Sequence, residues 1–195
     1  IFVVVIATLA FWKLYFLRLP ARAIPKTGIV SPASGKVVRI IRFRRGKPID
    51  VPKGLLGRAK AITADVTKDG TIVVIMLTPM DVHFQRAPAD GIVRGVAYQK
   101  GKFNNAVFGA GELHAFENEQ NAILLQTKQG TMKVVQVAGV LARRIECYVR
   151  KGQKVKKGDV IGLINLGSQC MLILPKKEVK VKIGQKVTDG ETIIA

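Results

Sequence analysis

The chain has 195 residues, of which 48% are hydrophobic, which is enough for one domain with a sizeable core and argues against intrinsic disorder. A formal net charge of +19 indicates a polyanionic partner, either nucleic acid or an anionic membrane surface. Two cysteines and two histidines exclude a disulfide scaffold and a multi-histidine metal centre, and no metal is expected. Aromatic residues make up only 6% of the chain, so a base-stacking role is weakly supported and no nucleic-acid partner is expected.

The first segment of the chain is apolar. Residues 1–12 form an apolar run interrupted by one threonine, and Lys13 and Arg18 begin a basic flank. A bilayer span needs about 20 apolar residues, so we expect the run to continue upstream and residues 1–19 to be the end of a transmembrane helix. The basic flank predicts that residues 20–195 lie on the cytoplasmic face of the cell membrane, against anionic headgroups. The alternative is the apolar region of a secretory signal, but no small-residue cleavage site follows.

The rest of the chain alternates short runs rich in valine and isoleucine with glycine turns, a pattern typical of β-structure. Sustained helical periodicity is absent from the sequence, and one short helix is expected within residues 104–118. The predicted strands are Gly35–Phe43, Thr71–Leu77, Gly91–Tyr98, Ala122–Thr127, Lys133–Val140, Arg143–Val149, Val160–Ile164, Met171–Leu174 and Val179–Ile183.

Two internal repeats indicate a duplication. Residues 31–37 resemble residues 87–93, and residues 152–158 resemble residues 184–190. Each element is a glycine turn that leads into a strand, which ordinary hairpins also use. The two pairs together are similar to the barrel-sandwich hybrid of biotinyl and lipoyl carrier domains. We therefore predict a mostly β body with a minor α component, built as a duplicated barrel-sandwich hybrid; no lysine stands in the Met-Lys context of a carrier.

Three segments could carry chemistry, namely residues 32–35, 78–88 and 166–169. Each alone has a structural explanation, because a lone histidine on a strand is more often structural than catalytic and a Gly-Ser pair at a strand end is typical of a turn. A hydrolase nucleophile elbow is not indicated, because a helix would have to follow the serine and a strand follows here.

In combination and order, these motifs resemble the phosphatidylserine decarboxylase family, in particular its short, archaeal-type branch. The resemblance rests on five matches and covers nearly the whole body, and the match at residues 135–149 is the longest and most specific. The matches are F-x-R-x-P at residues 16–20, S-P-A-D-G-K-V at residues 31–37 with Ser34 at the aspartate position, D-V-H-x-x-R-x-P-x-D-G at residues 81–91, V-Q-x-A-G-x-x-A-R-R-I-x-C-Y-V at residues 135–149, and Gly167-Ser168.

The resemblance implies a pyruvoyl enzyme that is made by self-cleavage between Gly167 and Ser168. The serine hydroxyl attacks the carbonyl of the glycine, an ester forms, and β-elimination followed by hydrolysis leaves a pyruvoyl group derived from Ser168. The product is a heterodimer of two self-derived chains, and whether it forms a homo-oligomer stays open. The new ketone forms a Schiff base with a serine phospholipid and acts as an electron sink for decarboxylation to the ethanolamine phospholipid. The lipid is either phosphatidylserine or archaetidylserine.

By the same resemblance, His83 is the base that activates Ser168, and the family aspartate orients that histidine and stabilises its charged form. Ser34 stands at the aspartate position and supplies no charge, so cleavage is expected to be slowed or abolished. Asp81 and Asp90 are alternative sources of the charge.

Two other functions stay open. Ser34 favours a cleavage-deficient relative of the decarboxylases. A membrane-anchored barrel-sandwich adaptor without chemistry would share the anchor and the repeats, but it needs a long helical hairpin that the sequence does not show. We predict a membrane-bound carboxy-lyase whose candidate substrate-binding residues are Arg86 and His114.

Overall fold

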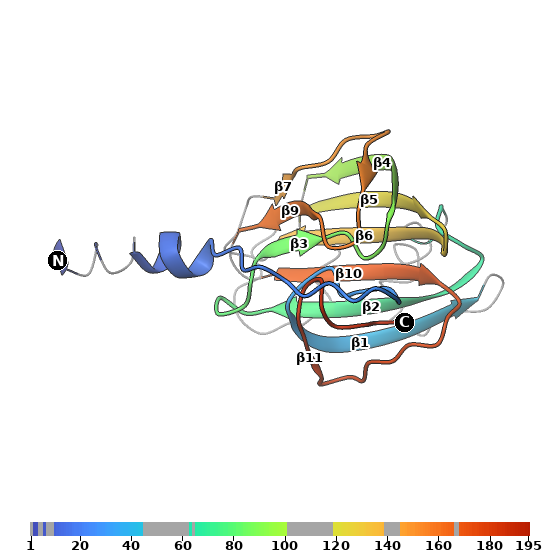
Figure 1. Cartoon of the computed structure of the whole chain (residues 1–195), viewed down its shortest axis with the longest axis horizontal. Helices are drawn as coiled ribbons and strands as arrows, with labels where there is room; N and C mark the ends of the chain where they lie inside the picture. Colours follow the sequence, from blue (N-terminus) through green and yellow to red (C-terminus); the bar gives the residue numbers. More distant parts are fainter. Residues whose placement is uncertain are drawn as a thin grey trace.

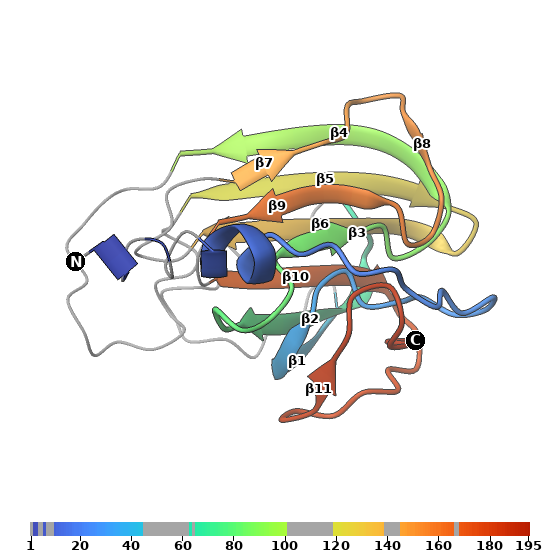
Figure 2. The same ribbon diagram turned by 60° about the vertical axis from the view of Figure 1, so that its left-hand side comes forward.

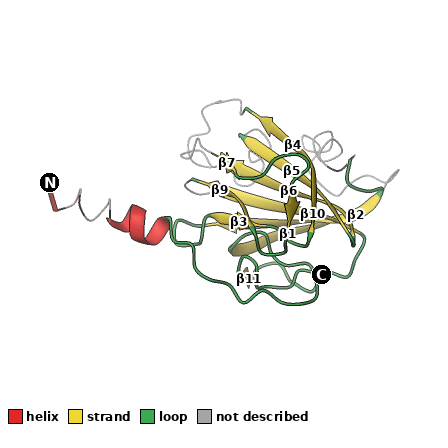
Figure 3. Ribbon diagram, turned by 45° about the horizontal axis from the view of Figure 1, so that its top comes forward, coloured by secondary structure: helices red, strands yellow, loops and turns green. Residues whose placement is uncertain are grey.

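The computed structural model describes residues 2–3, 6, 10–44, 63, 65–100, 119–138, 145–165 and 168–195. In this part of the chain, a six-residue π-helix, Phe11–Phe16, precedes eleven strands. The helix stands outside a body that is built of strands and loops (Figures 1 and 3). The prediction of a mostly β body is therefore confirmed.

The strands form two antiparallel sheets, an eight-stranded sheet of order β11-β1-β2-β10-β6-β5-β4-β8 and a three-stranded sheet of order β3-β9-β7. The larger sheet curls, and the smaller sheet contacts it at β5 and β6 (Figures 1 and 2). The strands are β1 (Gly35–Arg44), β2 (Asp69–Leu77), β3 (Phe84–Arg86), β4 (Gly91–Gln99), β5 (Gln120–Thr127), β6 (Gly130–Ala138), β7 (Ile145–Cys147), β8 (Lys154–Val155), β9 (Val160–Ile164), β10 (Ser168–Pro175) and β11 (Lys186–Val187).

The central strands of the larger sheet are buried on both faces. In β10, Cys170, Leu172 and Leu174 belong to the main core cluster, whereas Met171 and Ile173 belong to a second cluster. Successive residues of a strand point to opposite faces, so a strand covered on both sides needs a continuous apolar run. Each leucine, isoleucine or methionine side chain among them contributes about 1.5–3 kcal/mol when it is fully buried. The core therefore fixes β10 between β2 and β6 (Figure 2).

The repeated sequences occupy equivalent positions at the two edges of the larger sheet. Gly35 of β1 pairs with Val187 of β11, and Gly91 of β4 pairs with Val155 of β8. The register of β1 shifts at residues 37–39 and that of β4 shifts at residues 93–95, which are matching positions in the two repeats.

The turns that end these units also match. The N–H of Gly152 donates to the carbonyl of Val93 at 2.8 Å, and the N–H of Gly184 donates to the carbonyl of Val37 at 2.7 Å. Both glycines have a positive φ, of +88° and +89°, a conformation that other residues adopt only with strain. The sequence repeat is therefore a structural repeat.

One strand prediction is wrong. Residues 179–183 form no strand, and the strand of this region is Lys186–Val187. Val181 of this segment is buried in the core but Ile183 is exposed, and the N–H of Lys180 donates to the carbonyl of Ile194 at 2.8 Å. Strands β3 and β8 were not predicted because two or three residues show no periodicity. The helix expected within residues 104–118 lies outside the described residues.

The N-terminal segment differs from the expected anchor. In the described part of the chain, no helix is both long and apolar enough to span a bilayer, so the predicted transmembrane helix over residues 1–19 is not supported. The described helix ends at Phe16, whose side chain is fully buried against the body rather than exposed.

Candidate active site

His83 and Ser168 lie at the same end of the body. His83 precedes β3, and its carbonyl accepts the N–H of Ile164, the last residue of β9, at 3.1 Å. Ser168 follows Ile164 by four residues, a separation that spans at most about 14 Å. Its backbone pairs with Leu77 and Ala138, the last residues of β2 and β6. The helix projects from this end (Figure 1). Gly167 and the side chain of Ser168 lie outside the described residues.

The imidazole of His83 is fixed in one tautomer. Its Nδ1 lies 2.9 Å from the backbone carbonyl oxygen of Asp81. A carbonyl oxygen only accepts hydrogen bonds, so Nδ1 carries the proton of the neutral ring and Nε2 carries the free lone pair. Nε2 is buried and has no hydrogen-bond partner among the described residues. Buried polar atoms are almost always paired, so an acceptor without a partner among the described residues makes His83 a candidate functional residue.

Aromatic residues of the helix cover this ring. The ring of Phe16 lies 4.0 Å from that of His83, and the ring of Trp12 stacks on Phe16 at 4.4 Å. Burial lowers the pKa of His83, and the positive charge of Arg18 lowers it further; the carbonyl and charge of Asp81 act in the opposite direction. The net effect keeps the imidazole neutral at pH 7, the state in which Nε2 can accept a proton.

The turn that leads to His83 is held by Asp81 and Arg18. The carboxylate of Asp81 accepts the N–H of Thr78 at 2.8 Å and its hydroxyl at 2.7 Å. Arg18 donates to the carbonyl of Met80 at 2.5 Å. Asp81 therefore orients His83 through its backbone, while its carboxylate closes the turn.

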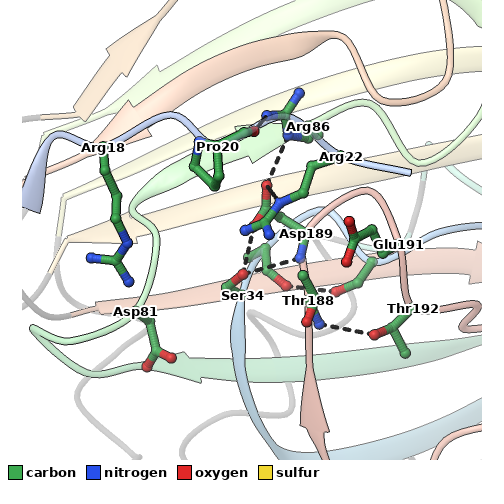
Figure 4. Close-up of polar contacts among 12 residues, drawn as sticks. Arg18, Pro20, Arg22, Ser34, Asp81, Arg86, Thr188, Asp189, Glu191 and Thr192 are labelled. Atoms are coloured by element: carbon green, nitrogen blue, oxygen red, sulfur yellow. Dashed lines mark hydrogen bonds and ion pairs between the residues drawn. The ribbon is translucent and has the colours of Figure 1, made fainter. Parts of the chain in front are cut away.

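Ser34 belongs to a different cluster. Its hydroxyl donates to Oδ1 of Asp189 at 2.5 Å and accepts the N–H of Asp189 at 3.1 Å. The same carboxylate, which is fully buried, binds Arg22 at 2.5 Å and Arg86 at 2.8 Å. Figure 4 shows these three side chains directed at Asp189, with Asp81 outside the cluster.

The structure thus gives Ser34 a partner that the sequence analysis missed. No hydrogen bond between described residues joins Ser34 to His83, and the role of Ser34 in orienting that histidine stays a prediction. Asp189 was overlooked because it precedes a glycine and is typical of a turn. Asp90, the counterpart of Ser34 in the other repeat, accepts the N–H of Lys157 at 2.7 Å, which matches the bond from Asp189 to Ser34.

Arg86 is fully engaged within the protein. Besides Asp189, it donates to the carbonyl of Gly158 at 2.8 Å and to that of Pro20 at 2.9 Å. Its substrate-binding role stays a prediction. His114 lies outside the described residues. Within the described ranges, no cluster of histidine, cysteine and acidic side chains could hold a metal ion.

Comparison with known proteins identifies the family. Residues 9–195 match the family model described as phosphatidylserine decarboxylase. The chain belongs to the phosphatidylserine decarboxylase family. It is therefore an enzyme of the carboxy-lyase class.

Named relatives align with almost the whole chain. It is 36% identical over 198 residues to the phosphatidylserine decarboxylase proenzyme of Chlorobaculum tepidum, an alignment that covers 98% of this chain and 82% of the relative. The proenzyme of Neisseria gonorrhoeae is 36% identical, with 96% of this chain and 68% of the relative covered. The proenzyme of Burkholderia pseudomallei is 34% identical, with 95% of this chain and 80% of the relative covered.

Proposed function

We propose that this chain cleaves itself between Gly167 and Ser168 and then decarboxylates a serine phospholipid to the ethanolamine phospholipid. The observation that carries the proposal is the buried Nε2 of His83, which has no hydrogen-bond partner among the described residues and lies at the end of the body where β10 begins. The names of the relatives support it, because each is called a phosphatidylserine decarboxylase proenzyme. Archaetidylserine is the alternative substrate.

His83 is the proposed base. Nε2 takes the hydroxyl proton of Ser168 while the hydroxyl oxygen attacks the carbonyl carbon of Gly167. The bond between the carbonyl carbon of Gly167 and the nitrogen of Ser168 breaks as the ester forms, and the proton on Nε2 passes to that nitrogen, which becomes a free amine. The low pKa of His83 leaves Nε2 unprotonated, and the hydrogen bond from Nδ1 to Asp81 holds the ring in place. Phe16 covers the imidazole of His83 and shields this base from bulk solvent.

The described residues fit a pyruvoyl group at position 168. Nε2 of His83, which has no partner among the described residues, can take the proton that Ser168 must lose when the group is made, and backbone pairing to β2 and β6 fixes the start of β10 from both sides. When present, the ketone supplies an electron sink for loss of the headgroup carboxylate.

We further propose that residues 168–195 stay bound as a second chain after cleavage, because β10 pairs along its length with two neighbours.

An anionic membrane surface, on the cytoplasmic face, is the proposed partner. The net charge of +19 supports it, as do the exposed side chains of Leu14, Leu19 and Met80 near the site. The matched hydrogen bonds of the two repeats support a duplicated barrel-sandwich hybrid.

The intact mass of purified protein tests the cleavage. We expect two chains that separate between Gly167 and Ser168, with a ketone at the start of the smaller one, and a single chain for Ser168→Ala. Cleaved protein should release CO₂ from phosphatidylserine vesicles, and His83→Gln should slow the cleavage. Equal splitting of the Ser168→Ala protein would refute the assignment. A single uncut, inactive chain would favour the cleavage-deficient relative, which the uncharged Ser34 supports.

A further inference from the structure

Three buried amide side chains form a hydrogen-bonded chain between the two sheets. Asn121 of β5 donates to Gln136 of β6 at 2.7 Å, and Gln136 donates to Gln85 of β3 at 2.8 Å. Gln85 donates in turn to the backbone carbonyl of His83 at 2.6 Å. The three side chains are at most 2% exposed. This amide chain therefore runs from the eight-stranded sheet to His83.

The direction of the amide chain is set by its last acceptor. The carbonyl of His83 only accepts, so Gln85 must present its NH₂ group to it and its oxygen to Gln136. Gln136 must then present its NH₂ group to Gln85 and its oxygen to Asn121. No amide can turn over without breaking a buried hydrogen bond, which is costly in a dry interior.

Gln136 is placed to relate His83 to Ser168. In the pairing of β6 with β10, Gln136 lies opposite Cys170, two residues from Ser168. Its amide reaches His83 through only one further side chain, that of Gln85. The strand that borders the proposed nucleophile is thus tied to the backbone of the proposed base.

The fold makes room for this contact. Gly162 of β9 pairs with Gln85, and a Cβ atom at Gly162 would lie 2.5 Å from the amide nitrogen of Gln136. His83 itself lies outside the strands, so ladder pairing does not fix it. Its carbonyl is held by two donors, Ile164 and Gln85.

We propose that Gln85 and Gln136 are positioning residues that fix His83 relative to the start of β10 and thereby set the rate of self-cleavage. The proposal rests on the proposed function, because it gives His83 the role of base. A displacement of about 1 Å in a reacting group can cost about 100-fold in rate. We therefore expect Gln136→Leu to slow cleavage by about 10- to 100-fold.

The test separates positioning from folding. Gln136→Leu and the milder Gln85→Met are compared with Thr127→Val, which removes a buried hydroxyl at the far end of β5, where it bonds to Gly130. Cleavage is followed by gel across a range of pH. The ring nitrogens of His83 are followed by ¹⁵N NMR in protein that carries Ser168→Ala and is therefore not cut. Because the chain has only two histidines, the His114→Gln variant shows which signals belong to His83.

We expect both glutamine variants to slow cleavage and to give mixed tautomers of His83, while Thr127→Val changes neither. Unchanged rate and unchanged ring signals in both glutamine variants would overturn the proposal, as would equal slowing by Thr127→Val. If the ring signals of His83 change but the cleavage rate does not, then His83 is not the base. That result would also refute a role of the two glutamines in cleavage. If the parent protein never cleaves, the proposed function fails, while the ring signals still decide whether the amides position His83.

Discussion

The buried carboxylate of Asp189 joins three distant parts of the chain, and its removal should be expensive. Asp189→Asn keeps the size of the side chain but leaves Arg22 and Arg86 without the counter-charge that now lies 2.5 and 2.8 Å away. Removing one partner of a buried ion pair costs about 3–5 kcal/mol. Because a domain is stable by only about 5–15 kcal/mol, we expect a loss of about a fifth or more of the free energy of unfolding.

Urea unfolding measures this loss, with all proteins carrying Ser168→Ala so that none is cut. The matched control is Asp69→Asn, which changes an exposed carboxylate 3.7 Å from Arg44, where both side chains are more than 40% exposed. Exposed pairs contribute about 0–1 kcal/mol, so the control should unfold nearly as the parent does. A loss below about 1 kcal/mol for Asp189→Asn would refute the reasoning, since it would mean that water solvates both guanidinium groups.

Three further outcomes are expected. The family resemblance alone predicts that Ser34→Asp speeds cleavage, but this change also places a second carboxylate against Asp189. The two negative charges should repel each other and lower the melting temperature. The exchange variant, which carries both Ser34→Asp and Asp189→Ser, should therefore melt at a higher temperature than Ser34→Asp alone. Folding lowers the pKa of His83, so as the pH falls the unfolded chain takes up a proton before the folded chain does. The free energy of unfolding should therefore fall as the pH drops below about 6.5. His83→Gln should weaken this pH dependence. Gly35→Ala should lower the melting temperature far more than Gly152→Ala does. The new Cβ would lie 2.2 Å from a backbone oxygen at Gly35, whereas it would lie in open space at Gly152. Equal losses would show that only the positive φ matters.

Sequence patterns predicted the elements that depend on local signals. The runs that became β2, β9 and β10 are apolar and bounded by turns, and the repeats marked matching turns. The polar contacts could not be predicted, because they join residues that the sequence separates widely. Ser34 and Asp189 are 155 positions apart. In the sequence, Gln136 is a polar residue between valines, a pattern typical of a side chain that faces solvent. In the structure the three-stranded sheet contacts β6, and Gln136 is buried.

The F-x-R-x-P match also gains a physical basis. Phe16 covers His83, Arg18 holds the turn before it, and Pro20 accepts a hydrogen bond from Arg86. Phe16 and Arg18 thus contact the segment that carries His83, and Pro20 contacts the Asp189 cluster, which the spacing alone did not reveal.

The position of β10 has a consequence for the order of events in the cell. β10 separates β2 from β6, so β1 and β2 cannot join β4, β5 and β6 in one sheet before β10 has been synthesised. Contacts between segments so far apart in sequence form slowly. The backbone frame around Ser168 is therefore completed late, and a nascent or misfolded chain lacks it. The self-cleavage that we propose would then be confined to chains that have finished folding.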